Sequence, residues 1–261
     1  MTASETVRTG SFRTVGVDLA SQNKQTAIAE IAWSGSGATL SSLRLGASND
    51  DIIEAATDAA VLGIDCPVGW PRPFTDLLIA VRAGKVPPDT AVDAAGKQAL
   101  AFRRTDEAVH AATGRWPLSV SADRIAYPAM RCAGLLARLA ATGQQVRRSG
   151  IDSLVAEVYP AAALRIWGLP TASYKATGST ISDSRATLVD ALIDQTGWLT
   201  WGDWRALCLE SHDALDAVVC AIVAGAVQLG RTTRPTGDEL AVAEEEGWIH
   251  LPVRDFLTRP Q

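Results

Sequence analysis

Two aspartates at the start of a long apolar segment are the residues best suited to chemistry. Asp213 and Asp216 lie three positions apart, and apolar residues follow them as far as Val227. At this spacing the two side chains share one face of a helix. Because burying an unpaired carboxylate is costly, two acids that lead into a buried helix predict a bound metal ion or a shared proton. The structural alternative places Asp213 beside the helix N-terminus, after a Ser211 cap, and binds Asp216 to a buried donor.

Three further acids lie within short apolar segments of the kind that form buried strands. They are Asp18 in TVGVDLA, Asp65 in VLGIDC and Glu157 in LVAEVY. Acids at strand ends can converge on a final helix, and several carboxylates are what a two-metal phosphoryl-transfer site requires. For any one of them, a satisfied structural group at a strand end is an equally good interpretation. Glu157 is the weakest candidate, since it can instead pair with a buried arginine.

The elements that carry these acids predict an α/β fold. Strand patterns cover residues 14–20, 26–33, 39–45, 61–66 and 154–159. The first two are separated by turn residues and form a predicted hairpin. Helical patterns cover residues 49–60, 161–167 and 183–196, and the aspartate helix comes last. The tryptophan-rich stretch 198–204 fits neither pattern clearly, and its aromatic side chains are interpreted as packing.

A helical insertion is predicted inside this α/β unit. Residues 74–83, 91–113 and 128–142 have helical patterns, and the strand pattern returns only at residue 154. We therefore expect one domain over residues 14–261 with a helical insertion at about residues 72–150, preceded by a loose polar tail at residues 1–13. Between Arg72 and Arg165, Lys and Arg outnumber Asp and Glu, so this part of the chain can face a polyanion or present an ordinary solvated surface.

Composition favours a cytoplasmic protein that does not enter a membrane. Of 261 residues, 47% are hydrophobic and 20% are charged, and the formal net charge is −5. The polar N-terminal stretch lacks the apolar core of a signal peptide. The longest apolar segment, residues 215–229, is too short for a confident span and contains an acid. Four cysteines without metal-ligand spacing are predicted to be reduced core thiols.

Several other side chains are candidates for binding a substrate. Arg103 and Arg104 can hold a phosphate, but they can equally pair with neighbouring acids such as Asp106, Glu107 or Glu157. Trp70 closely follows the acid of the fourth strand and can stack on a base, although an aromatic in a proline-rich loop more often packs inward. The histidine that precedes Asp213 can assist proton transfer, but a helix-end role is the better interpretation.

The motifs together resemble a known family. They are residues 15–20 (VGVDLA), 63–71 (GIDCPVGWP), 104–106 (RTD), 157–161 (EVYPA) and 212–217 (HDALDA). This combination is similar to domain-of-unknown-function family 429, whose members are predicted nucleases of the ribonuclease H fold, and it spans roughly residues 14–252. The resemblance implies a ribonuclease H-like mixed sheet flanked by helices. It implies an activity class without naming a substrate.

Carried over by position, the resemblance assigns the acids to a metal site. Asp18 becomes the acid of the first strand and Asp65 that of the fourth, while Asp213 and Asp216 belong to the final helix. These four are the expected catalytic residues and ligands of Mg²⁺ or Mn²⁺, with Glu157 as a further possible ligand. In such a site one ion activates water for attack on a phosphodiester and the other stabilises the leaving oxygen.

Three functions compete at this point. The first is a metal-dependent nuclease, a hydrolase of phosphodiester bonds in DNA or RNA. The second is a noncatalytic nucleic-acid or protein-binding module with a residual acidic site, which the acidic net charge favours slightly. The third is a phosphotransferase of the actin-like fold, which lacks support because neither a GxxxxGK[ST] nor a GxGxxG loop is present. The sequence does not indicate an oligomeric state.

Overall fold

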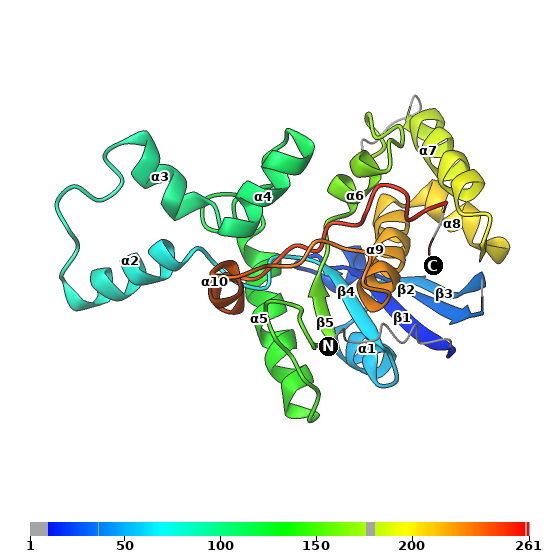
Figure 1. Cartoon of the computed structure of the whole chain (residues 1–261), viewed down its shortest axis with the longest axis horizontal. Helices are drawn as coiled ribbons and strands as arrows, with labels where there is room; N and C mark the ends of the chain where they lie inside the picture. The colour runs from blue at the N-terminus through cyan, green and yellow to red at the C-terminus, as the bar shows by residue number, and fades with distance from the viewer. Residues whose placement is uncertain (1–9, 36, 176–180, 259, 261) are drawn as a thin grey trace, which may run out of the picture.

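A mixed six-stranded sheet forms the centre of the molecule. The computed structural model describes residues 10–35, 37–175, 181–258 and 260, so most of the polar tail lies outside the described residues. The strands are β1 (Phe12–Asp18), β2 (Ala27–Ser34), β3 (Gly37–Leu45), β4 (Val61–Asp65), β5 (Val155–Glu157) and β6 (Leu199–Thr200). They lie in the order β5-β4-β1-β2-β3-β6 (Figure 1).

Strand direction divides the sheet into two parts. β1, β2 and β3 form an antiparallel meander, while β4 runs parallel to β1 and β5 runs parallel to β4. β6 is a two-residue strand parallel to β3 at the other edge. The parallel strands β1, β4 and β5 therefore end at one edge of the sheet, which is where acids from distant parts of the chain can meet.

Helices flank this sheet within the described part of the chain. They are α1 (Asn49–Ala56), α2 (Arg72–Ala83), α3 (Ala94–Ala101), α4 (Arg104–Thr113), α5 (Ala126–Ala141), α6 (Pro160–Ile166), α7 (Ile181–Gln195), α8 (Arg205–Glu210), α9 (His212–Gln228) and α10 (Glu239–Glu246). Short 3-10 turns lie at Asn23–Gln25 and Gly202–Trp204. None of the helices in the described ranges is long and apolar enough to cross a membrane.

Small residues bring α9 unusually close to the sheet. A Cβ added at Gly16 of β1 would collide with backbone atoms of Ala217 and Ala221, and one added at Gly63 of β4 would collide with the carbonyl of Cys220. Thr14 also donates its hydroxyl hydrogen to the carbonyl of Ala221 at 2.9 Å. The glycines are thus required by the close approach of helix to strand. This contact holds the start of α9 in a defined position beside the ends of β1 and β4.

The sheet separates two hydrophobic cores. On one face, α6, α7, α8 and α9 pack on side chains such as Ile31 and Leu40. On the other face, α1 and α5 pack on Val17, Ile28 and Ile64. The four cysteines are buried and free, as predicted. Two covered faces account for the nearly continuous apolar runs of β1 and β4.

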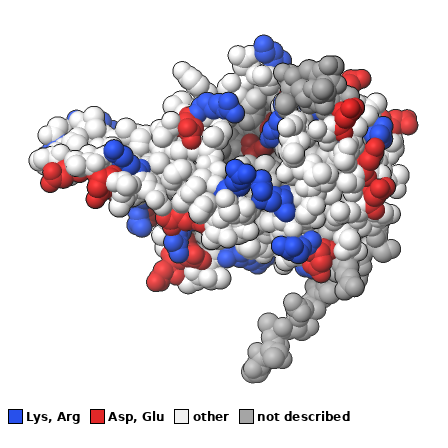
Figure 2. Space-filling view, turned by 90° about the horizontal axis from the view of Figure 1, so that it is seen from above, with Lys and Arg blue, Asp and Glu red and all other residues white. Residues whose placement is uncertain are grey.

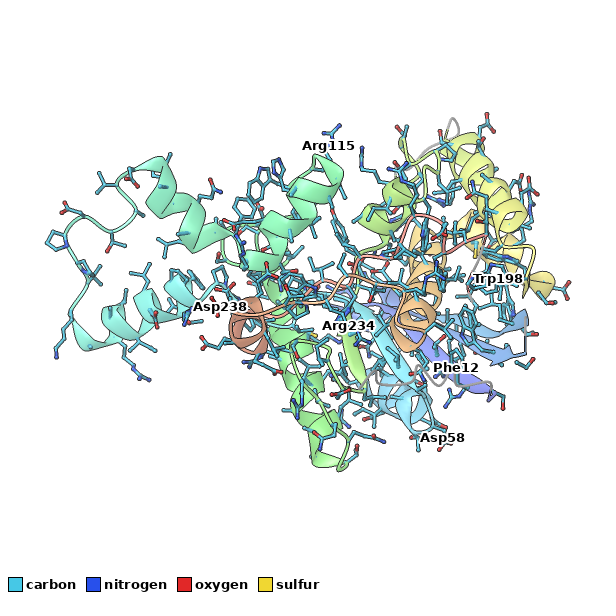
Figure 3. The ribbon with its side chains drawn as sticks, in the orientation of Figure 1. Phe12, Asp58, Arg115, Trp198, Arg234 and Asp238 are labelled. Carbon is cyan, nitrogen blue, oxygen red and sulfur yellow. The ribbon has the colours of Figure 1, made fainter. Side chains whose placement is uncertain are left out.

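Several aromatic side chains pack together at the end of the sheet opposite the acids. The ring of Phe12 stacks on that of Trp33, and Trp33 in turn stacks on Trp198, with centroid separations of 5.4 and 4.9 Å. Figure 3 labels Phe12 and Trp198 in this part of the molecule. Trp204 donates its indole hydrogen to the carbonyl of Leu40 at 3.0 Å. The tryptophan-rich stretch therefore serves packing, as the sequence indicates.

Helices α2 to α5 lie between β4 and β5, in the part of the chain where an insertion is predicted. α2 and α3 contain no buried residues and extend away from the sheet (Figure 1). Figure 2 shows acidic and basic side chains interspersed on this projecting part and on the body. The predicted helix at residues 91–113 is two helices, α3 and α4, because the chain is extended at Phe102 and Arg103.

Candidate metal centre

Asp18 and Asp65 lie side by side at one edge of the sheet. Each is the last residue of its strand, and the two are register partners in the parallel β1–β4 pair. Successive side chains of a strand alternate between faces, so register partners in a parallel pair point to the same face. That face is the one covered by α9. The strand acids therefore face the helix that carries the other two predicted ligands.

Asp216 is the most deeply buried acid of the group. It lies in the second turn of α9, which begins after Ser211 accepts a hydrogen bond from the backbone of Ala214. Its side chain is 0% exposed. Tyr174 donates its hydroxyl hydrogen to Oδ1 of Asp216 at 2.9 Å, and the ammonium of Lys175 lies 2.6 Å from Oδ2. Two neighbouring residues of the loop after α6 thus contact both oxygens of one carboxylate.

His212 completes a compact set of ligand atoms. Asp18, His212 and Asp216 each offer one oxygen or nitrogen, and these atoms lie within 4.8 Å of one another. His212 Nδ1 lies 2.9 Å from Oδ1 of Asp213, and both of these side chains are partly exposed. The acid in the first turn of α9 therefore contacts the histidine, while the acid in the second turn faces the strands.

Electrostatics show that the cluster carries excess negative charge. Burial, reinforced by Asp216 and Asp65, raises the pKa of Asp18 well above its ordinary value. Burial also raises the pKa of Asp65 to about 7, although nearby Lys175 opposes this effect. Burial alone would lower the pKa of Lys175, but Asp216 and Asp65 outweigh it and raise that pKa. Desolvated carboxylates that share one small site favour a proton or a cation.

The residues present fit a hard divalent cation. Asp216 Oδ2 is a buried atom without a hydrogen bond to any described residue, apart from its ion pair with Lys175, and His212 Nδ1 lies beside Asp213. A set of carboxylate oxygens and one imidazole nitrogen is suited to Mg²⁺ or Mn²⁺. Asp65, on the strand next to Asp18, provides a further carboxylate at the same edge.

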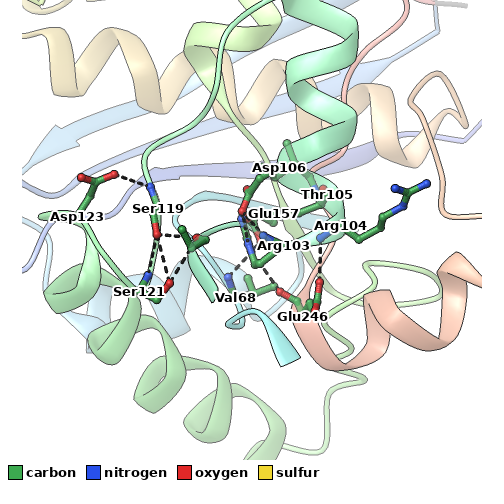
Figure 4. Close-up of polar contacts among 12 residues, drawn as sticks. Val68, Arg103, Arg104, Thr105, Asp106, Ser119, Ser121, Asp123, Glu157 and Glu246 are labelled. Atoms are coloured by element: carbon green, nitrogen blue, oxygen red, sulfur yellow. Dashed lines mark hydrogen bonds and ion pairs between the residues drawn. The ribbon is translucent and has the colours of Figure 1, made fainter. Parts of the chain in front are cut away.

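Glu157 has a different environment. Both of its carboxylate oxygens accept hydrogen bonds from Arg103, at 2.7 and 2.8 Å, and one of them also accepts from the backbone of Val68. Arg103 in turn contacts both oxygens of Asp106 (Figure 4). The guanidinium is 2% exposed, so this is a buried ion-pair network. Of the two roles that the sequence left open for Arg103 and Glu157, the structure shows their pairing.

The other substrate-binding candidates lie outside the acidic cluster. Arg104 is 56% exposed and pairs with Glu107 and Glu239 near α10. Trp70 lies in the loop between β4 and α2, where its partly buried ring packs against the core that α1 and α5 cover. The packing alternative for Trp70 is therefore what the structure shows.

No pattern in the sequence indicates that two further residues belong to the cluster. Tyr174 and Lys175 lie in a polar stretch without apolar periodicity, far from every predicted motif. Arg185 of α7 holds them in place, donating from Nε to the carbonyl of Tyr174 at 2.9 Å and from Nη1 to the carbonyls of Leu209 and Glu210. Only the tertiary arrangement of this loop beside α9 reveals their relation to Asp216.

The fold and site define a mixed α/β protein with an acidic cluster where two parallel strands end. Residues 16–240 match the family model described as "Protein of unknown function (DUF429)". The chain belongs to this family. Comparison with curated proteins and with solved structures found no match.

Proposed function

We propose that the protein is a nuclease of the ribonuclease H-like fold, which hydrolyses phosphodiester bonds in DNA or RNA with Mg²⁺ or Mn²⁺. The observation that carries this proposal is the meeting of Asp18, His212 and Asp216, whose ligand atoms lie within 4.8 Å of one another. The sheet also supports it, because β1, the first strand of an antiparallel hairpin, and the parallel strand β4 both end in an acid. Fold resemblance alone would not identify the chemistry.

Each residue of the cluster has a defined part in this mechanism. Asp18, Asp216 and His212 would hold the metal, and Asp65 supplies charge on the neighbouring strand. When bound, the metal lowers the pKa of a water molecule and stabilises the leaving oxygen. Asp213 orients the imidazole of His212 through their 2.9 Å contact. The side chain of Asp216 is itself inaccessible to solvent.

Metal binding is the first property to test. Thermal unfolding of the full chain with Mn²⁺ is expected to show stabilisation, because a ligand at about 100 times its dissociation constant adds roughly 2.7 kcal/mol to the folded state. Asp18→Asn should remove this response. Asp190→Asn is the matched control, since Asp190 is a half-exposed acid that pairs with Arg205 outside the cluster.

Catalysis is the second property to test. With Mn²⁺ present, we expect hydrolysis of bis(p-nitrophenyl) phosphate and of single- or double-stranded DNA or RNA, and we expect Asp18→Asn to abolish both. Absence of Mn²⁺ stabilisation together with absence of cleavage across this panel would refute the proposal.

A noncatalytic binding module is the second candidate. The observation that favours it is the contact between Lys175 and Asp216, because an internal ammonium already neutralises one of the proposed ligands. Such a module would bind a nucleic acid equally well with and without Asp18→Asn. It would also show no single-turnover cleavage when the protein is in excess over a labelled oligonucleotide.

A further inference from the structure

Lys175 reaches from the surface into the most buried part of the cluster. Its side chain is 44% exposed, whereas that of Asp216 is 0% exposed, yet the ammonium nitrogen lies 2.6 Å from Oδ2 of Asp216. That oxygen has no hydrogen bond to any other described residue. The lysine therefore occupies the side of the carboxylate that a metal ion would need.

The loop backbone is held independently of the lysine side chain. Tyr174 makes two hydrogen bonds: its hydroxyl donates to Asp216, and its backbone carbonyl accepts from Arg185. Arg185 also contacts the carbonyls of Leu209 and Glu210, just before α9 begins. The ammonium of Lys175 sits on a flexible four-carbon stem, so it can leave Asp216 without any movement of the loop.

The charges of the cluster favour a lysine contact that ends when a metal ion binds over one that is permanent. In the proposed mechanism Asp216 would give an oxygen to the metal ion, and Lys175 already contacts its Oδ2. An ammonium kept at contact distance from the same oxygen would then repel the incoming ion at short range. Once displaced, the ammonium would no longer have Asp216 as its partner, and the phosphodiester of the substrate carries a single negative charge that would match it.

On the basis of the proposed metal-dependent function, we propose that the ammonium of Lys175 pairs with Asp216 until a divalent ion binds. The ion then displaces the ammonium, which binds the phosphate of the substrate. Lys175 thus has two successive partners. Before metal entry it lowers the electrostatic cost of the buried carboxylate of Asp216. Afterwards it contributes to the affinity for the phosphodiester.

The first test measures Mn²⁺ affinity by isothermal titration calorimetry on the full chain. Lys175→Met removes the competing cation and should tighten Mn²⁺ binding about tenfold, which corresponds to about 1.4 kcal/mol. Lys175→Arg keeps a cation and should stay near the wild-type affinity. Arg205→Met is the matched control, because it removes one positive charge from a 46% exposed side chain that pairs with Asp190. Lys175→Gln gives a second neutral variant, and circular dichroism verifies that each variant is folded.

The second test measures phosphate binding at saturating Mn²⁺. For bis(p-nitrophenyl) phosphate, Lys175→Met should raise KM about tenfold, with a smaller change in kcat, whereas Lys175→Arg should retain most of the wild-type KM. An unchanged KM would overturn the phosphate role.

The outcomes also separate this inference from the proposed function. If the wild type binds Mn²⁺ and cleaves substrate while both neutral variants bind Mn²⁺ no more tightly, the displacement idea fails and the nuclease proposal stands. If only the neutral variants bind Mn²⁺, the lysine is a permanent partner of Asp216, so the displacement idea fails and so does the metal-dependent function of the wild-type chain. If neither the wild type nor the neutral variants bind Mn²⁺, both proposals fail.

Discussion

Asp18 and Asp65 are register partners at the ends of two neighbouring parallel strands, and both face the helix that carries Asp216. This pairing brings together acids 47 positions apart in the sequence. In folding terms the arrangement is unfavourable, because each carboxylate raises the free energy of the other and both lose water. Residues that destabilise the fold in this way are typical of functional sites.

The unfavourable pairing predicts that Asp18→Asn stabilises the metal-free protein. Removing one negative charge relieves repulsion from Asp216 and Asp65, so we expect the free energy of unfolding in EDTA to rise by about 1 kcal/mol. Asp216→Asn should have the opposite effect, since it leaves the ammonium of Lys175 without its carboxylate partner. Urea unfolding in EDTA measures both changes. A loss of stability in Asp18→Asn would contradict the repulsion that we describe.

Asp65 predicts a distinctive pH dependence in the metal-free protein. Its pKa is about 7 in the folded state and 3.8 ordinarily, so the folded state binds the extra proton between these values. The stability associated with this proton is fully present below pH 3.8 and is lost as the pH rises to about 7. The Asp65→Asn variant does not lose this stability. Its free energy of unfolding should therefore rise relative to that of the wild type, by about 2 kcal/mol across that range. Urea unfolding at a series of pH values measures the difference, and a constant difference would contradict the prediction.

The buried ion-pair network predicts that replacing Arg103 lowers stability much more than replacing the adjacent Arg104. Arg103→Met leaves the carboxylate of Glu157 buried without its cation, which should cost about 3 to 5 kcal/mol. Arg104→Met should change stability by less than about 0.5 kcal/mol, because that side chain is 56% exposed. Replacing Glu157 by Gln in the Arg103→Met background should recover part of the loss. Urea unfolding again measures these differences, and equal effects at the two positions would show that the network does not hold the insertion to the sheet.

The same network explains which parts of the fold could be predicted from the sequence. The first four strands and the aspartate helix have local signals, namely apolar runs bounded by turn residues and a Ser211 cap. The break at Phe102 and Arg103 has none, since it depends on Glu157, which is 54 positions away from Arg103. Helix α10 is dominated by acidic residues and lacks a clear apolar stripe, so its sequence did not predict it. Non-local ion pairs decide such elements, and local patterns do not contain them.

The residues of the candidate site also fall into those that the sequence predicts and those that it does not. Asp18, Asp65 and Asp216 were predicted because an acid inside an apolar run is conspicuous in any sequence. Lys175 and its neighbour Tyr174 are common residues in a polar loop, and nothing in their surroundings marks them. Their position depends on the buried guanidinium of Arg185, which joins the loop to the segment before α9.

His250 predicts a contribution to stability that is lost in mild acid. The side chain is 1% exposed and its ring nitrogens contact the hydroxyl of Thr232 and the carbonyl of Ser149. Burial is the main reason that its pKa falls from 6.5 to about 4. Between these values the unfolded chain binds a proton that the folded protein does not, so the contribution of His250 to stability falls as the pH drops from 6.5 towards 4. The full shift corresponds to about 3 kcal/mol.

His250→Gln separates this contribution from those of the carboxylates. Glutamine does not titrate and its amide can still donate to the carbonyl of Ser149. Unfolding by urea at pH 7, 6, 5 and 4 in EDTA should show the wild type losing stability relative to the variant at each step below 6.5. His110→Gln is the control, because His110 stacks on Trp116 in the insertion with ring centroids 4.3 Å apart and is not fully buried. Parallel pH profiles for the wild type and His250→Gln would show that the buried imidazole does not limit stability in acid.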